Sequence, residues 1–201
     1  MVHWKESADK IRAEILTRAW SDKRGSFTGA FDHDELDASV LLLSDLGFLP
    51  PNDPRFVKTT NAIGRELMRN GLMLRYAAED DFGLPESAFL ACQFWYIDAL
   101  ASVGRKDEAR ELFDELLKKR NAFGLLSEDL NPATGQLWGN LPQTYSMAGM
   151  INSAMTLSRT WEDAWCGRPA KHDTTPKGQE PAEHDLTAAG LISPRRSLNV
   201  N

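Results

Sequence analysis

The hydrophobic pattern of this chain repeats with the period of an α-helix, and two kinds of helical segment alternate along it. Three segments carry apolar side chains on one face only and are predicted as surface helices: residues 4–20, 53–70 and 106–120. Three others are apolar on nearly every face: residues 36–46, 87–103 and 143–160. A helix that is apolar all round must be covered on all sides. The alternation therefore favours outer and inner layers of helices, or a stacked array of helical hairpins.

The connections between the predicted helices are long before each apolar helix and short before an amphipathic one. The long links are residues 21–35, 71–86 and 121–142, and the short links are residues 47–52 and 104–105. Because inner and outer helices run antiparallel, all the long links fall on the same rim. Loops of such length in a compact domain are usually functional. We therefore expect the site on that rim, at the amino ends of the inner helices.

The composition excludes several classes of function. The 201 residues include 23 Lys and Arg against 29 Asp and Glu, a net charge of −6, so no basic face for nucleic acid is expected. The longest apolar stretch, around residues 88–100, is too short to span a membrane. The amino terminus lacks the pattern of a signal peptide, which predicts a cytoplasmic protein. Cys92 lies in an apolar run and is expected as a small core residue.

The carboxy-terminal segment differs in character from the rest of the chain. Residues 167–201 are rich in proline, contain no aromatic residue and have few large apolar ones. This composition is typical of a disordered or loosely attached tail. We therefore divide the chain into a helical domain, residues 1–166, and a tail, residues 167–201.

The long links concentrate carboxylates and aromatic side chains. Sugars are bound by stacking on aromatic faces and by hydrogen bonds from carboxylates and amides, and glycosidic bonds are cut by pairs of carboxyl groups. The candidate sugar-contacting residues stand near the predicted rim: Asp37, Glu86, Trp95, Trp138 and Asn140. This makes a carbohydrate substrate the first hypothesis for the site.

Each candidate also has a structural interpretation. Acidic runs in loops are most often solvated surface, and Glu86 stands at a predicted helix start, where a carboxylate favours the helix dipole. Trp95 lies in an apolar helix and is more often a core side chain than a sugar platform. His33 lies among acidic residues, but no second His at ligand spacing accompanies it, so no metal site is predicted. No P-loop or dinucleotide fingerprint is present, and no cofactor is predicted.

Four stretches carry a more specific signal: residues 34–55, 86–95, 124–132 and 135–146. In order and spacing they resemble the bacterial branch of glycoside hydrolase family 15, which contains glucoamylases, glucodextranases and trehalases. The resemblance implies an (α/α)6 toroid with its active site at one rim. For this chain it implies an all-α, partial (α/α)6 toroid of about six helices in alternating outer and inner layers.

The resemblance also implies inverting hydrolysis of α-glucosides, either oligosaccharides or trehalose, by two carboxyl groups. Glu128 matches the family's general base, which activates water. The family's general acid belongs to a motif ahead of the matched region. We therefore expect this chain to hold the general-base half of the site and to be inactive alone. Two positions depart from the family: Met147 stands where His is common, and Asp129 where Glu or Gln is usual.

Six helices are expected to leave some of the inner layer uncovered. Phe94, Trp95 and the run 41–43 expect neighbours on both sides, and exposed apolar patches of this kind predict association. We therefore expect either a separate N-terminal half-chain as partner or self-association.

Two alternatives stay open. The first is a non-catalytic helical scaffold, because residues 101–113 resemble the turn of tetratricopeptide-type repeats, although no repeat period recurs. The second is a remnant that binds sugar without cutting it.

Overall fold

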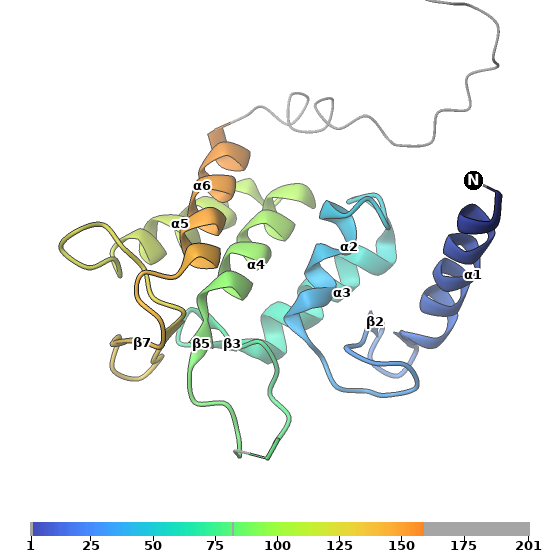
Figure 1. Cartoon of the computed structure of the whole chain (residues 1–201), viewed down its shortest axis with the longest axis horizontal. Helices are drawn as coiled ribbons and strands as arrows, with labels where there is room; N and C mark the ends of the chain where they lie inside the picture. Colours follow the sequence, from blue (N-terminus) through green and yellow to red (C-terminus); the bar gives the residue numbers. More distant parts are fainter. Residues whose placement is uncertain (1, 82, 159–201) are drawn as a thin grey trace, which may run out of the picture. The chain divides into compact units, whose positions relative to one another are not determined.

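Helices dominate the computed structural model, which describes residues 2–81 and 83–158 (Figure 1). The α-helices of these residues are α1 (Val2–Arg18), α2 (Leu42–Asp45), α3 (Pro54–Leu67), α4 (Leu90–Ser102), α5 (Lys106–Leu117) and α6 (Thr144–Ser158). A 3-10 helix, η1 (Ala38–Leu41), precedes α2. Short strands lie between the helices: β1 (Trp20–Ser21), β2 (Ser26–Phe27), β3 (Met68–Arg69), β4 (Leu72–Met73), β5 (Ala88–Phe89), β6 (Asp129–Leu130) and β7 (Leu137–Trp138).

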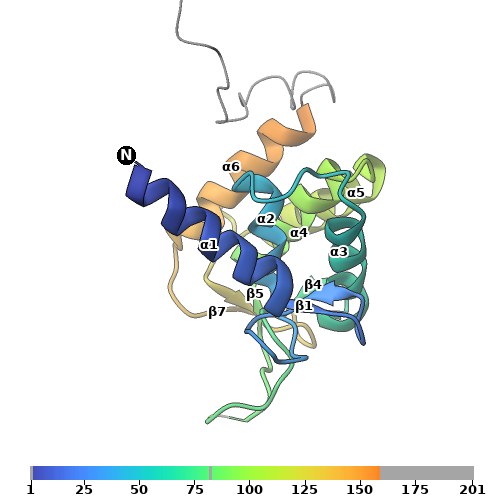
Figure 2. The same ribbon diagram turned by 90° about the vertical axis from the view of Figure 1, so that its right-hand side faces the viewer.

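Helix α4 is buried on nearly every side, as its apolar pattern predicts. It packs against α3, α5, α6, η1 and β4, and Figures 1 and 2 show it among these elements. The expectation that Phe94 lacks cover is wrong. Its ring is fully buried, 6.4 Å from the ring of Phe113 on α5. On the α6 side, a Cβ added at Gly149 would lie 2.6 Å from a ring atom of Phe94, so the missing side chain lets the two helices approach closely.

Helices α3 and α5 bury one face each, which confirms the amphipathic pattern. Helix α3 begins as predicted. The Asp53 carboxylate accepts a hydrogen bond from the Arg55 backbone N–H (2.8 Å), and Pro54 occupies the first turn. Cys92 is buried in α4, as expected, and burial raises the pKa of its thiol.

Two helices present apolar side chains that the described residues do not cover. On α1, Trp4 is 76% exposed and Ile11 61%, so the predicted apolar face is largely uncovered. On α6, predicted as an inner helix, Tyr145 is 71% exposed and Ile151 57%. Among the helices of the described residues, large exposed apolar side chains therefore lie on α1 and α6 rather than around Phe94.

The predicted helix over residues 36–46 is shorter than expected. The Asp37 side chain accepts from the Ser39 N–H (2.8 Å) and starts η1, which continues into the single turn of α2. Leu41, at the end of η1, is buried, whereas none of the residues of α2 is buried. Gly47, with a φ of +69°, turns the chain after α2, and the backbone N–H of Phe48 bonds back to Leu43 (2.8 Å).

Small antiparallel sheets modify the all-α prediction. Strands β1 and β2 form one pair, β3 and β4 another, and β5, β6 and β7 a three-stranded sheet. The helix predicted over residues 53–70 ends earlier, at Leu67, and Asn70-Gly71 forms the two-residue turn between β3 and β4. Both residues have positive φ (50° and 80°), the conformation of a type I′ hairpin turn, for which Asn-Gly is the preferred pair. The chain is therefore helical with small sheets.

The three long links meet at one end of the helices, as the connection lengths predict. The Ala38 N–H, just after the first link, donates to the Arg75 carbonyl in the second (2.8 Å). The Asn70 side chain donates to the Pro132 carbonyl in the third link (3.2 Å). In Figures 1 and 2 the second link extends below the helices, and the first link and the hairpin around β7 lie at the same end.

Other predictions concern membranes and the carboxy-terminal segment. Within residues 2–81 and 83–158, none of the helices has the length and apolar character that a membrane span requires. The proposed boundary at residue 166 and the predicted tail, residues 167–201, lie outside the described residues.

Candidate functional site

The three-stranded sheet fixes Glu128 at the amino end of α4. In this sheet Phe89 pairs with Asp129, and Asp129 pairs in turn with Trp138. The carbonyl of Glu128 accepts the Leu90 N–H (3.0 Å), which opens α4. Phe89, at the N-cap of α4, offers no capping side chain, so this sheet contact satisfies one of the donors that a helix start leaves unpaired. The site is thereby attached to the most buried helix.

The Glu128 side chain is half-buried and contacts the turn that follows β7. Its Oε2 accepts two hydrogen bonds from Asn140, one from the side-chain Nδ2 (2.8 Å) and one from the backbone N–H (3.3 Å). The Glu128 N–H donates in return to the Asn140 carbonyl (2.9 Å). Gly139 lies against the same carboxylate, since a Cβ added there would be 3.1 Å from Oε2. Two of the predicted site residues, Glu128 and Asn140, are thus in direct contact.

The two faces of this sheet differ in character. Side chains of paired residues share a face, so Asp129 lies between Phe89 and Trp138 on one face. The opposite face carries Ala88 and Leu130, both fully buried. Trp138 is 41% exposed. A carboxyl group between two aromatic side chains can bind a sugar by hydrogen bonding and stacking.

Asp129 is a second carboxyl group beside Glu128. Burial raises the pKa of Asp129, and the negative charge of Glu128 raises it further, whereas a hydrogen bond with Ser87 opposes the rise. Asp129 therefore holds its proton to a higher pH than an ordinary aspartate does.

Asp37 stands at the N-cap of η1, which packs against α4. Besides its capping hydrogen bond, it accepts one from Arg75 Nε (3.3 Å). Gly29 lies against it, since a Cβ there would be 2.8 Å from the Asp37 Cβ. The charges of Asp37 and Asp129 both raise the pKa of the buried Cys92 thiol, a smaller effect than burial itself, so both carboxylates act on the first turn of α4.

The remaining predicted residues are Glu86 and Trp95. Glu86 is exposed in the link before β5. Trp95 is half-buried on α4, with its ring edge-on to Phe89 at 6.5 Å. Among the described residues, no group of three His, Cys, Asp or Glu side chains could hold a metal ion.

Sequence reasoning did not single out Asp129, Gly139, Arg75 or Ser87 as parts of the site. One signal was available: Asn131 and Gly135 are turn residues between two short apolar-polar segments, a hairpin pattern that places Asp129 opposite Trp138. The contacts of Gly139 and Arg75 had no comparable local signal.

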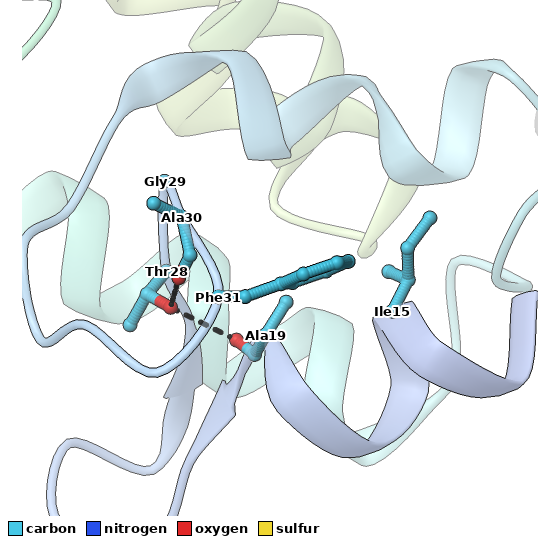
Figure 3. A pocket seen from close by; sticks show the side chains of 6 residues that line it. All are labelled: Ile15, Ala19, Thr28, Gly29, Ala30 and Phe31. Atoms are coloured by element: carbon cyan, nitrogen blue, oxygen red, sulfur yellow. Dashed lines mark hydrogen bonds between the residues drawn. The ribbon is translucent and has the colours of Figure 1, made fainter. Parts of the chain in front are cut away.

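A separate open hollow of about 350 Å³ lies between the end of α1 and the first long link (Figure 3). Its lining residues are mostly apolar: Ile15, Ala19, Thr28, Gly29, Ala30 and Phe31. The Thr28 hydroxyl lies within hydrogen-bond distance of the Ala19 and Ala30 carbonyls, so it is engaged by the backbone. With no titratable side chain in its lining, this hollow offers no acid or base chemistry.

A helical scaffold with carboxylates and aromatic side chains at the meeting point of its long links suits a protein that acts on carbohydrates. Sequence comparison identifies the class directly. Residues 2–155 match the family described as glycosyl hydrolases family 15, and the chain belongs to this family. The resemblance noted from the sequence is confirmed.

Curated relatives of the chain are trehalases. It is 39% identical over 164 residues to trehalases of Mycolicibacterium smegmatis and Mycobacterium tuberculosis, and each alignment covers 80% of this chain and 24% of the relative. It is 37% identical over 169 residues to a trehalase of Thermoplasma volcanium, covering 84% of this chain and 26% of the relative. The chain thus spans about a quarter of the length of these relatives.

Solved structures of a glycosidase share the fold. The wild-type glycosidase superposes with a TM-score of 0.66 at 20% identity, over 76% of this chain and 43% of that one. A variant of a glycosidase in complex with glucose gives the same TM-score and coverage at 19% identity.

Proposed function

We propose that this chain provides the general-base half of an inverting glycoside hydrolase site for α-glucosides, either oligosaccharides or trehalose. The observation that carries this proposal is the half-buried carboxylate of Glu128, held by two hydrogen bonds where the long links meet. Family membership supports cleavage of a glycosidic bond. The trehalase relatives support trehalose as a substrate.

In the proposed reaction Glu128 takes a proton from water, and the water oxygen bonds to the anomeric carbon as the glycosidic bond breaks. The departing oxygen needs a proton from a second carboxyl group, about 6.5–9.5 Å from the first in inverting enzymes. We assign this acid to a separate N-terminal half-chain. General acid catalysis contributes about 10²–10⁴-fold, so we expect the chain to be inactive without it.

The uncovered apolar surfaces support a partner of this kind. Trp4 and Ile11 on α1, and Tyr145 and Ile151 on α6, are exposed in the described chain. Large apolar side chains left exposed on a helix are typical of an interaction site where they form a patch. We propose that a further layer of helices covers it and that together they form an (α/α)6 toroid. Structural similarity to a glycosidase supports this arrangement.

We assign the sugar contacts to the rim around Glu128. Trp138 is the strongest candidate, because its exposed ring shares a face of the sheet with Asp129. Asp37, Glu86 and Trp95 are candidates for contacts further from Glu128.

The experiment compares the purified chain with the same chain mixed with an N-terminal half from a relative. Glucose release from trehalose and maltose is followed by NMR, which also identifies the anomer formed. We expect no hydrolysis by the chain alone and hydrolysis with inversion by the mixture. Glu128→Gln should lower the rate about 10²–10⁴-fold. The control Glu111→Gln, at an exposed position on α5, should leave it unchanged. Activity that survives Glu128→Gln contradicts the proposal.

Calorimetry with glucose, maltose and trehalose separates the alternatives. Sugar binding by a mixture that never hydrolyses would identify a sugar-binding remnant. Peptide binding without affinity for any sugar would identify a helical scaffold.

A further inference from the structure

The two carboxylate oxygens of Glu128 have different surroundings. Oε2 accepts both the Nδ2 hydrogen bond of Asn140 (2.8 Å) and its backbone N–H (3.3 Å). A carboxylate has about two lone-pair sites on each oxygen, so two donors occupy those of Oε2. A proton taken from water then has its acceptor at Oε1.

Gly139 allows the turn to approach the carboxylate this closely. A Cβ at Gly139 would lie 3.0 Å from the Glu128 Cβ and 3.1 Å from Oε2. Gly135, in the same hairpin, provides a comparison. Its φ of +73° nearly equals the +74° of Gly139, yet a Cβ at Gly135 would meet no atom within 4 Å. Both positions favour glycine for their backbone, but only at Gly139 would an added side chain also crowd Glu128.

We infer that Gly139 and Asn140 form a cradle that positions Glu128, holding Oε2 and presenting Oε1 to the attacking water. This inference rests on the proposed function and deepens it. Asn140, predicted from the sequence as a sugar contact, is here a positioning residue that acts through Glu128. A misplacement of about 1 Å in a reacting group can lower the rate about 10²-fold. Contacts that hold the Glu128 carboxylate in place therefore favour the reaction.

The test is an NMR titration of the full chain that needs no activity. The side-chain amide and the backbone N–H of Asn140 both donate to Oε2 of Glu128. The NMR signals of these two groups should therefore shift with pH at the same midpoint as the signal of the Glu128 carboxyl carbon. The side-chain amide of Asn70 is the control, because it donates to the Pro132 carbonyl (3.2 Å) and should not follow this midpoint.

Variants separate the Glu128 contact from its surroundings. Asp129 is the neighbouring titratable group. In Asp129→Asn the Asn140 and Glu128 signals should still share one midpoint, even where loss of the Asp129 charge changes its value, whereas Glu128→Gln should abolish it. Gly139→Ala should uncouple the Asn140 signals from Glu128, and Gly135→Ala should not.

Two results would overturn the inference: Asn140 signals that do not follow Glu128 in the unmodified chain, or a shared midpoint that persists in Gly139→Ala. The titration of the unmodified chain decides the question even where Gly139→Ala does not fold. Failure of the proposed function can be distinguished from failure of this inference. Hydrolysis that survives Glu128→Gln would remove the role of the base and leave the titration result intact.

Discussion

Helices α4 and α6 have the same kind of sequence and very different surroundings. Both are apolar on nearly every face, and both were predicted to be inner helices. Most of the 13 residues of α4 are buried, whereas in the 15 residues of α6 only Ser146, Ser153 and Leu157 are. Helix α4 has packed elements around it, but α6 packs mainly against α4 and α5.

The difference shows that an apolar pattern indicates that a helix must be covered, but not which residues cover it. For α4 the described residues provide this cover, with Phe113 on one side and Gly149 on another. For α6 they leave Tyr145 and Ile151 exposed. The candidate site is attached to the well-covered helix, because the Glu128 carbonyl accepts a hydrogen bond from Leu90, the first residue of α4.

The sharpest test of this comparison uses the same substitution on both helices. Ile97 on α4 is fully buried, and Ile151 on α6 is 57% exposed. Ile97→Ala should lower the free energy of unfolding by about 2–5 kcal/mol through lost burial and a cavity. Ile151→Ala should change it by no more than about 0.5 kcal/mol. Urea denaturation measures both, and equal losses would contradict the difference in cover.

A second substitution tests the contact between the two helices. Gly149→Ala places a Cβ 2.6–2.9 Å from atoms of Phe94, so one of the helices must shift. Overpacking of this kind costs about 1–3 kcal/mol. Asn152→Ala, at an exposed position of α6, is the control and should have little effect on the urea midpoint. A Gly149→Ala variant as stable as the parent would show that α6 is free to move away from α4.

The way the helices begin extends the comparison to α3. Helix α3 has a side-chain cap, Asp53, whereas α4 begins on the sheet. Asp53→Ala should lower the free energy of unfolding by about 1 kcal/mol. Asp114→Ala, exposed on α5, should leave it within about 0.5 kcal/mol. Thermal unfolding followed by circular dichroism compares the two, and an equal effect would argue against the cap.

The smallest effect concerns Asp129, which lies on β6 and pairs with Phe89 before α4, and it depends on pH. Because burial and the Glu128 charge raise the pKa of Asp129 in the folded chain, its ionisation opposes folding. The protonated carboxyl group of Asp129 therefore stabilises the folded chain at pH values below the pKa that Asp129 has in the unfolded chain. This contribution is lost as the pH rises through the pKa of Asp129 in the folded chain. Asp129→Asn should therefore be more stable than the parent above this range, and the difference should shrink in acid. Denaturation at several pH values measures it, and a difference independent of pH would point to another cause.

Local sequence signals predicted some elements well. The apolar run of α4, the Asp53-Pro54 start of α3 and the one-sided pattern of α5 were all interpreted correctly, because each depends on neighbours within a few residues. The helix predicted over residues 53–70 extends too far because Asn70-Gly71 suits a helix end and a hairpin turn alike, and only the pairing of Met68 with Met73 distinguishes them. The helix predicted over residues 36–46 begins only at Ala38, as a 3-10 helix capped by the Asp37 side chain, and Gly47 turns the chain after it.

The sequence by itself determined where the helices lie, where the long links fall and which family the chain resembles, because periodicity, caps and motifs are local. Tertiary structure decided which apolar helix is covered and what Glu128 contacts. Asn140 lies 12 positions beyond Glu128, and it reaches the carboxylate only because β6 and β7 pair and turn back beside it. Contacts of this kind depend on how distant segments pack, and no pattern within either segment specifies them.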